Sequence, residues 1–289
     1  MRTCRLRPAL ISGSRVVLIL GCGYTGIRVA RILATLGHTV IGTNRTGHLT
    51  EPGINSLRLD LPGPLDFSGL PEDLHVLHSI PTVDGAEYTA ELLAALGCRP
   101  ARLVYLSTTG VYGATRDVDE NTAPNPASER EWLRFAAERA VLDAPYPTLV
   151  LRPAAIYGPG RGLHVSLPQG RFRLSGEGLN FVSRIHVDDL AAITAEALLA
   201  DVTGAYPVAD EHPCTSIEIA RYCSELLHAP MPAGAAADTL HETRRADRRV
   251  DGRAICRLLG LSLQYPSYRE GIPASLAAQD AQFRARSSE

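Results

Sequence analysis

The sequence predicts an α/β fold, a doubly wound parallel sheet with a small lobe towards the C-terminus, on three observations. The first is a short apolar strand at 16–20 that runs directly into a glycine turn and then a helix ending at Gly37. The second is the continued alternation of short apolar runs with amphipathic helices, which is typical of parallel sheets. The third is a length of 289 residues with 45% hydrophobic side chains, enough for a large core.

The glycine turn reads Gly-Cys-Gly-Tyr-Thr-Gly and has the spacing G-x-G-x-x-G. Gly21 permits the tight turn, Gly23 lets the backbone approach a pyrophosphate, and Gly26 lets the helix pack close to the strand. Free N–H groups and the helix dipole attract phosphates at this point, so Tyr24 and Thr25 are also predicted cofactor contacts. The alternative is an ordinary tight turn, but the position between a strand and a helix favours dinucleotide binding.

A second strand is expected at 39–43, and the residues after it bear on the choice of cofactor. Enzymes that use NAD usually carry an acid about 20 residues past the glycine motif, where it binds the ribose 2′-hydroxyl. Here Asn44 and Arg45 occupy this stretch, and no acid is present. A neutral residue followed by arginine suits a 2′-phosphate, so NADP is the expected cofactor. NAD, with Arg45 as a solvated loop residue, is the alternative.

The rest of the N-terminal half continues the alternation of strands and helices. Apolar runs that end at proline or glycine are typical of buried strands, and longer amphipathic stretches are typical of helices. Strands are expected at 56–59, 75–80, 102–107 and 148–151, and helices at 85–96 and 127–142.

The C-terminal half is less regular. Asp188 or Asp189 is expected to cap a helix that ends near Ala200, which makes His186 and these acids a helix start rather than an acid–base pair. A strand is expected at 205–208, and helices at 215–227, up to 259 and from about 273. We expect 1–14 to be a loose leader and 15–152 to be the cofactor-binding domain. Residues 153–289 are expected to complete its sheet, at about 184–209, and to form the substrate lobe.

Composition argues against several classes of function. The net charge of −2 indicates neither nucleic acid nor an anionic membrane as a partner, and no apolar run is long enough to span a bilayer. The six cysteines form no C-x-x-C pair, which is typical of a reducing cytoplasm rather than of a disulfide or zinc framework, so no metal is expected. All 29 basic residues are arginine, which excludes Schiff-base chemistry and a lysine-assisted tyrosine.

Further motifs follow the glycine turn in a characteristic order. They are STTGVYG at 107–113, DENTAPNP at 119–126, LRPAAIYGPG at 151–160, RIHVDDLA at 184–191 and LLGL at 258–261. Over nearly all of residues 16–275 the chain resembles the extended short-chain dehydrogenase/reductase family, the group of nucleotide-sugar epimerases and dehydratases. The resemblance implies a Rossmann domain with a C-terminal substrate lobe. It also implies that Thr108 takes the place of the family's catalytic Ser/Thr and that Asp60 and Leu61 lie near the adenine.

Two departures make the chain similar to the atypical branch of this family. The glycine spacing is G-x-G-x-x-G where the family usually has G-x-x-G-x-x-G. The family's Tyr-x-x-x-Lys pair is also missing, because its tyrosine falls on Arg130 and its lysine on Arg134. Arg134 can still bind ribose hydroxyls, as the family's lysine does. Arg130 cannot donate the proton that the tyrosine supplies, because a guanidinium does not deprotonate in proteins.

The expected proton donor is Tyr112, because it follows the end of the fifth strand, where ligands gather in open α/β sheets. A packed tyrosine below the pocket is the alternative. At the same strand end, Ser107 is expected to contact the cofactor. Thr108 is expected to bind a substrate oxygen, with a simple cap of the strand end as the alternative. Tyr157 is a candidate pocket residue, with a stiffened turn as the alternative. Arg249 is a candidate for binding substrate phosphates, with a solvated helix face as the alternative.

The sequence therefore predicts a cytoplasmic, NADP-preferring oxidoreductase or epimerase. Its expected substrate is nucleotide-sugar-like or another small carbonyl or hydroxyl compound. The alternative is a non-catalytic NADP-binding sensor that has lost the proton donor. A homodimer is expected, because the second and third helices occupy the family's pairing positions. On the third helix, Trp132, Ala136 and Ala140 form a narrow apolar seam.

Overall fold

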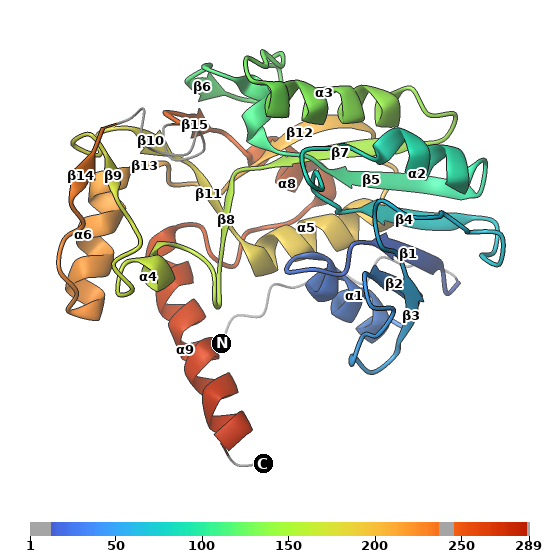
Figure 1. The fold of residues 1–289 in the computed structure, drawn as a ribbon, viewed down its shortest axis with the longest axis horizontal. Helices are drawn as coiled ribbons and strands as arrows, with labels where there is room; N and C mark the ends of the chain where they lie inside the picture. The colour runs from blue at the N-terminus through green and yellow to red at the C-terminus, as the bar shows by residue number, and fades with distance from the viewer. Residues whose placement is uncertain (1–12, 237–245, 288–289) are drawn as a thin grey trace.

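The centre of the molecule is a seven-stranded parallel sheet (Figure 1). The structure is a computed structural model, and it describes residues 13–236 and 246–287. The strands are β1 (Val16–Leu20), β2 (Thr39–Asn44), β3 (Ile54–Arg58), β4 (Leu74–His78), β5 (Pro100–Leu106), β7 (Thr148–Pro153) and β12 (Gly204–Val208). Their order is β12-β7-β5-β4-β1-β2-β3, with every neighbouring pair parallel. This order reverses between β1 and β4, as in a Rossmann sheet, so the predicted fold class is confirmed.

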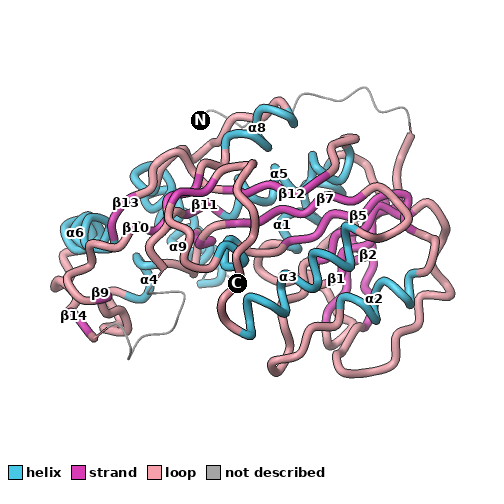
Figure 2. The backbone as a smooth tube through the Cα atoms, turned by 90° about the horizontal axis from the view of Figure 1, so that it is seen from above, coloured by secondary structure: helices cyan, strands magenta, loops and turns pink. Residues whose placement is uncertain are grey.

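Helices cover both faces of the sheet (Figures 1 and 2). One face carries α1 (Gly26–Thr35), α5 (Val187–Leu199) and α8 (Arg253–Leu259), and the other carries α2 (Thr89–Leu96) and α3 (Glu129–Leu142). Within the described residues, no helix combines the length and the apolar character needed to cross a bilayer.

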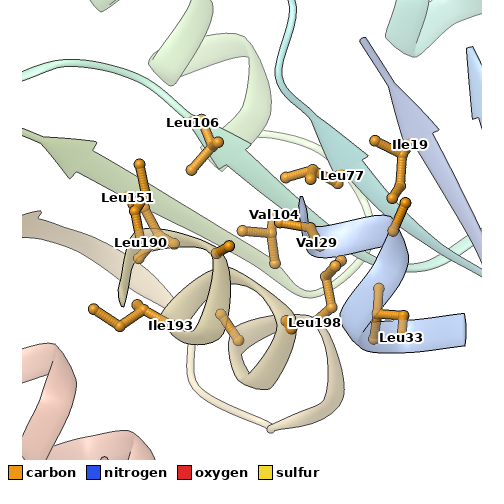
Figure 3. Packing of buried hydrophobic residues seen from close by; sticks show 14 of the residues in the cluster. Ile19, Val29, Leu33, Leu77, Val104, Leu106, Leu151, Leu190, Ile193 and Leu198 are labelled. Atoms are coloured by element: carbon orange, nitrogen blue, oxygen red, sulfur yellow. The ribbon is translucent and has the colours of Figure 1, made fainter. Parts of the chain in front are cut away.

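The core consists of two apolar layers, one on each side of the sheet. Successive side chains of a strand point to opposite faces. In β1, Val17 and Ile19 accordingly join the layer under α1 and α5, whereas Leu18 and Leu20 join the layer under α2 and α3. Figure 3 shows the first layer, where the helical residues Val29, Leu33, Leu190, Ile193 and Leu198 meet Leu77, Val104, Leu106 and Leu151 of the strands.

After β7 the chain builds a second lobe and returns once to the sheet as β12 (Figure 1). Short strand pairs and three helices make up most of the remainder. The pairs are β8 (Ala155–Tyr157) with β11 (Arg184–His186), β10 (Phe181–Val182) with β13 (Cys214–Thr215), β9 (Leu174–Ser175) with β14 (Gly234–Ala235), and β15 (Arg249–Val250) with β6 (Asp117–Val118). The helices are α4 (Leu163–Ser166), α6 (Ser216–Leu227) and α9 (Tyr268–Ser287).

Two expected helix starts in this half are wrong. The N-cap of α5 is His186, whose Nδ1 accepts the N–H of Asp188 at 3.2 Å. Asp189 instead accepts the backbone N–H groups of the 264–265 loop at 2.7 and 2.9 Å, so it fastens a distant segment that the sequence does not reveal. The last helix begins at Tyr268 and continues through Pro273, which was expected to mark its start because proline favours the first turn.

Candidate active site

The glycine turn between β1 and α1 is docked on the end of β2. Gly21 has φ +91°, and its N–H donates to Thr43 Oγ1 at 2.9 Å. The N–H of Cys22 donates to the carbonyl oxygen of Thr43 at 2.8 Å. A Cβ atom at Gly26 would overlap the carbonyl oxygen of Gly21. Glycine is therefore required at both ends of the turn for α1 to pack this close to the strand.

The start of α1 fits the pyrophosphate of a dinucleotide. Gly23 is exposed, and a Cβ atom there would meet nothing within 4 Å, so the space above it is open. The N-cap residue Thr25 makes no side-chain capping bond, and the first turn of α1 contains no acid. The N–H groups of Ile27 and Arg28 donate to the carbonyl oxygens of Gly23 and Thr25 at 3.0 Å, but the positive dipole end of α1 remains available for an anion. Gly23, Tyr24, Thr25 and Gly26 are the residues that would hold the phosphates.

Tyr24 joins the glycine turn to the second lobe. Its hydroxyl donates to the carbonyl oxygen of Pro159 at 3.0 Å. The guanidinium carbons of Arg28 and Arg161 lie 4.4 and 5.4 Å from the centre of its ring. Arg28 also forms an ion pair with Asp188 at 3.0 Å. Arg161, which the sequence analysis did not single out, thus brings a cation from the second lobe to the edge of the phosphate site.

A cavity of about 1170 Å³ lies beyond the carboxyl ends of β5 and β7. It is bounded by the residues that follow these strands, by the first turns of α3 and by the segment leading into β15. Its charged lining residues are Arg116, Arg130, Glu131, Arg134, Arg161, Asp247 and Arg248. The described lining thus carries five arginines and two acids, a balance that favours an anionic ligand, although Arg116 is paired with Asp247 and Arg134 with Glu87. Within the described residues, no group of His, Cys, Asp and Glu side chains could hold a metal ion.

Ser107 and Thr108 line this cavity at the end of β5, as their expected roles require. Thr108 Oγ1 accepts the N–H of Gly110 at 3.1 Å and caps the 3-10 turn η1 (Thr109–Tyr112). The hydroxyl of Ser107 is buried and has no hydrogen-bond partner in the described part of the chain. A buried hydroxyl without a partner is costly, so Ser107 is suited to a ligand's polar group.

Arg134 reaches the same strand end from α3. Its Nη2 donates to the carbonyl oxygen of Leu106 at 2.7 Å, and its Nη1 lies 3.0 Å from Glu87 Oε2. Glu87 in turn accepts the hydroxyl of Thr89 at 2.6 Å. Both members of the ion pair are buried, which holds the guanidinium in one place on the cavity wall.

Arg248, which precedes β15, is a second buried arginine in the lining of this cavity. Its side chain donates to the carbonyl oxygens of Thr115, at 3.1 Å, and Gly113. Among the described residues, no carboxylate lies within ion-pairing distance of it. Burial lowers the pKa of Arg248, although Glu131 counteracts this. A buried guanidinium that faces a cavity and has no carboxylate partner among the described residues is suited to binding an anion.

Known proteins have similar sequences and structures. The model of the NAD dependent epimerase/dehydratase family matches residues 81–208. The structure of a functionally unknown conserved protein from Silicibacter pomeroyi DSS is 32% identical, with a TM-score of 0.77 over 92% of this chain and 99% of that chain. The chain belongs to the NAD-dependent epimerase/dehydratase family. Members of this family are enzymes of the extended short-chain dehydrogenase/reductase type.

One further known protein is similar to this chain in sequence, and another is similar in structure. A 2-alkyl-3-oxoalkanoate reductase from Stenotrophomonas maltophilia (strain K279a) is 29% identical over 216 residues, which are 61% of this chain and 63% of the reductase. The chain thus matches less than two thirds of that reductase. The structure of MoeE5 with UDP-glucuronic acid and NAD is 20% identical, with a TM-score of 0.75 over 93% of this chain and 100% of that chain. At this identity the likeness concerns the fold alone.

In this epimerase-family chain, the residues expected near the ribose 2′-phosphate, Asn44 and Arg45, lie at the end of β2. Those expected near the adenine, Asp60 and Leu61, follow β3, which is the neighbour of β2 in the sheet. Asn44 donates to the carbonyl oxygen of His48 at 2.7 Å and accepts the N–H of Gly47, so it shapes the turn after β2. Arg45 and Asp60 are exposed, and Leu61 is half-buried. Arg45 is therefore accessible to a ligand at this edge.

The structure conflicts with Tyr112 as the family member's proton donor. Tyr112 is 0% exposed, belongs to an apolar cluster with Val111 and Val118, and does not line the cavity. Its hydroxyl accepts a hydrogen bond from Arg152 Nη1 at 3.0 Å. Burial raises the pKa of Tyr112, which opposes ionisation. The alternative reading of a packed tyrosine below the pocket is the one that this geometry supports.

Tyr157 and Arg249 also lie outside the cavity that holds Thr108. Tyr157 is 4% exposed, lines a separate hollow, and donates to the carbonyl oxygen of Ser267 at 3.2 Å. Arg249 stacks on Phe181, with 3.6 Å between its guanidinium carbon and the ring centre, and lies 3.5 Å from Asp117. The preceding residue, Arg248, occupies the place intended for Arg249. The arginine-rich segment therefore reaches this cavity through Arg248, whereas the sequence analysis selected Arg249.

Proposed function

We propose that this protein is an NADP-preferring oxidoreductase or epimerase acting on a small anionic compound that carries a carbonyl or hydroxyl group. The observation that carries the proposal is the buried guanidinium of Arg248, which has no carboxylate partner among the described residues and lines the same cavity as Thr108 and Arg134. An anionic group bound to Arg248 would place the rest of the substrate near the hydroxyls at the end of β5. The six cysteines without C-x-x-C spacing support a reducing, cytoplasmic location.

Each residue of the site has a role in this proposal. The bound dinucleotide would supply or accept a hydride. Thr108 would orient the substrate oxygen, Arg134 would hold the ribose, and Ser107 would contact the cofactor. Nucleotide sugars and 3-oxo acids both combine an anionic group with a hydroxyl or carbonyl group. UDP-glucuronic acid, the ligand of MoeE5, and the 2-alkyl-3-oxoalkanoates for which the S. maltophilia reductase is named therefore both belong to the proposed substrate class.

Cofactor choice depends on Arg45 in this proposal. The absence of an acid at the end of β2 and the exposure of Arg45 support NADP over NAD. Arg45→Glu should weaken NADPH binding by about 1.5–3 kcal/mol, the scale of a charge-assisted hydrogen bond, and leave NADH binding nearly unchanged. Isothermal titration of both cofactors measures this directly. Equal affinity of the unmodified protein for NADPH and NADH would contradict the NADP preference.

Turnover distinguishes the enzyme from the non-catalytic sensor, which the family membership does not favour. We expect the protein to interconvert NADP and NADPH with at least one member of a panel of UDP-glucuronic acid, UDP-glucose and 2-alkyl-3-oxoalkanoates. Epimerisation would appear as product formation without net change in NADPH absorbance. Tight NADPH binding without conversion of any compound in the panel would favour the sensor.

A further inference from the structure

The cavity lacks the usual proton-transfer groups. Its described lining contains no Tyr, His or Cys, and the chain has no lysine. Arginine cannot release its proton, so two carboxylates remain, Asp247 and Glu131. Asp247 is already engaged, because it forms an ion pair with Arg116 at 2.6 Å and accepts the N–H of Phe181 at 2.9 Å. Glu131 is the remaining candidate for proton transfer.

Glu131 is held firmly at the start of α3. It is the third helical residue and completes a capping box with Ser128. Its Oε2 accepts the N–H groups of Ala127 at 2.8 Å and Ser128 at 3.0 Å. The second oxygen, Oε1, takes no part in this cap. One oxygen therefore anchors the carboxylate and leaves the other for a ligand.

Glu131 lines the same cavity as Thr108 and Arg248, the two groups that would bind the ends of the proposed substrate. A Cβ atom at Gly110 would lie 3.5 Å from Thr108 Oγ1 and 4.0 Å from Glu131 Cγ, so Thr108 and Glu131 flank the same glycine. Glu131 and Arg248 line the same cavity, and the charge of Glu131 partly offsets the effect of burial on the pKa of Arg248. A substrate that binds its anionic group to Arg248 and its oxygen to Thr108 would pass Glu131.

We infer that Glu131 is the catalytic group that exchanges a proton with the substrate, an assignment that rests on the proposed function. In the oxidation direction, Glu131 Oε1 takes the proton of the substrate hydroxyl. The adjacent C–H bond breaks, its hydride leaves with the electron pair for the oxidised cofactor, and a carbonyl forms. In reduction the same carboxyl returns the proton to the carbonyl oxygen. Glu131 thereby does the work of the family tyrosine, from the position next to Arg130.

The decisive variant is Glu131→Gln, because glutamine can replace glutamate in a capping box and cannot accept the proton. Glu129→Gln is the matched control, since it removes the same charge from the same helix turn at an exposed position outside the cavity. Turnover should fall by roughly 10²–10⁴ in Glu131→Gln, the usual contribution of a positioned acid or base, and stay unchanged in Glu129→Gln.

Ligand binding separates this role from a structural one. NADPH and UDP-glucuronic acid, titrated calorimetrically, should bind Glu131→Gln at least as tightly as the unmodified protein, because the variant removes a negative charge from an anion site.

The possible outcomes address the two proposals separately. A fall in turnover smaller than about tenfold, or one that Glu129→Gln equals, would overturn the role of Glu131 and leave the proposed function intact. A loss of turnover together with a matching loss of ligand binding would also overturn it, because the residue would then act by shaping the site. An unmodified protein that turns over no member of the substrate panel would overturn both.

Discussion

Glu138 and Arg152 form a buried ion pair beneath the cavity, and its loss is expected to destabilise the whole protein. Arg152 Nε lies 3.1 Å from both carboxylate oxygens, and Nη2 lies 2.7 Å from Oε2. The side chains are 0% and 7% exposed, respectively. Arg152 also donates to Tyr112, so one guanidinium connects α3, β7 and η1. The charge of Arg152 is therefore balanced entirely within the protein.

Glu138→Ala should lower the free energy of unfolding by about 3–5 kcal/mol, because breaking a buried pair leaves one charge uncompensated. Helix propensity does not explain such a loss, since alanine is the best helix former. Tyr112 continues to accept one hydrogen bond from Arg152 but carries no charge. Glu138→Gln retains an acceptor for the guanidinium and should therefore lose less stability than Glu138→Ala.

Urea unfolding measures these differences, and α3 offers a matched control. Asp143 lies 3.8 Å from Arg139 in a pair whose side chains are 69% and 63% exposed. Asp143→Ala should cost no more than about 1 kcal/mol, because water and salt screen exposed pairs. If Glu138→Ala and Asp143→Ala were destabilised equally, the argument that burial leaves Arg152 uncompensated would be refuted.

Three further outcomes are expected. Tyr112→Phe removes one hydrogen bond and should cost about 1 kcal/mol while turnover persists; a loss of turnover of about a hundredfold in steady-state assays would restore Tyr112 as the proton donor. Burial raises the pKa of Asp210 to about 7, so folding favours its protonated form. Stability should therefore fall as pH rises through about 7, and Asp210→Asn should flatten that fall in urea midpoints; an unchanged slope would contradict this. We also propose a homodimer, because Trp132 is 54% exposed on the apolar seam of α3, and light scattering that reports 31.1 kDa would count against it.

Local sequence was sufficient for the elements of the sheet, because each strand and its following helix carry their own apolar period. β1 was expected at 16–20 and is found there, and β2 and β7 differ from expectation by one or two residues at their ends. The glycine turn was predicted equally well, because the tight turn and the close packing of the helix depend on residues that are adjacent in the sequence. The second lobe was predicted less well, because its strands of two and three residues are too short to show an alternation of apolar and polar residues.

The assignment of side chains to the site required the tertiary structure. Successive residues of a strand point to opposite faces, so the entry into β15 decides that Arg248 meets the cavity while Arg249 meets Phe181 and Asp117. That strand is placed by pairing with β6, more than a hundred residues earlier in the chain.

The sequence by itself determined the Rossmann sheet, the glycine turn and the absence of the Tyr-x-x-x-Lys pair, because these follow from residues close together in the chain. Only the tertiary structure decided that Tyr112 is buried against Arg152 and that Glu131, Thr108 and Arg248 line one cavity. The physical reason is distance along the chain. Burial and charge at the site are set by contacts between segments such as β7, α3 and β15, whose meeting no local pattern encodes.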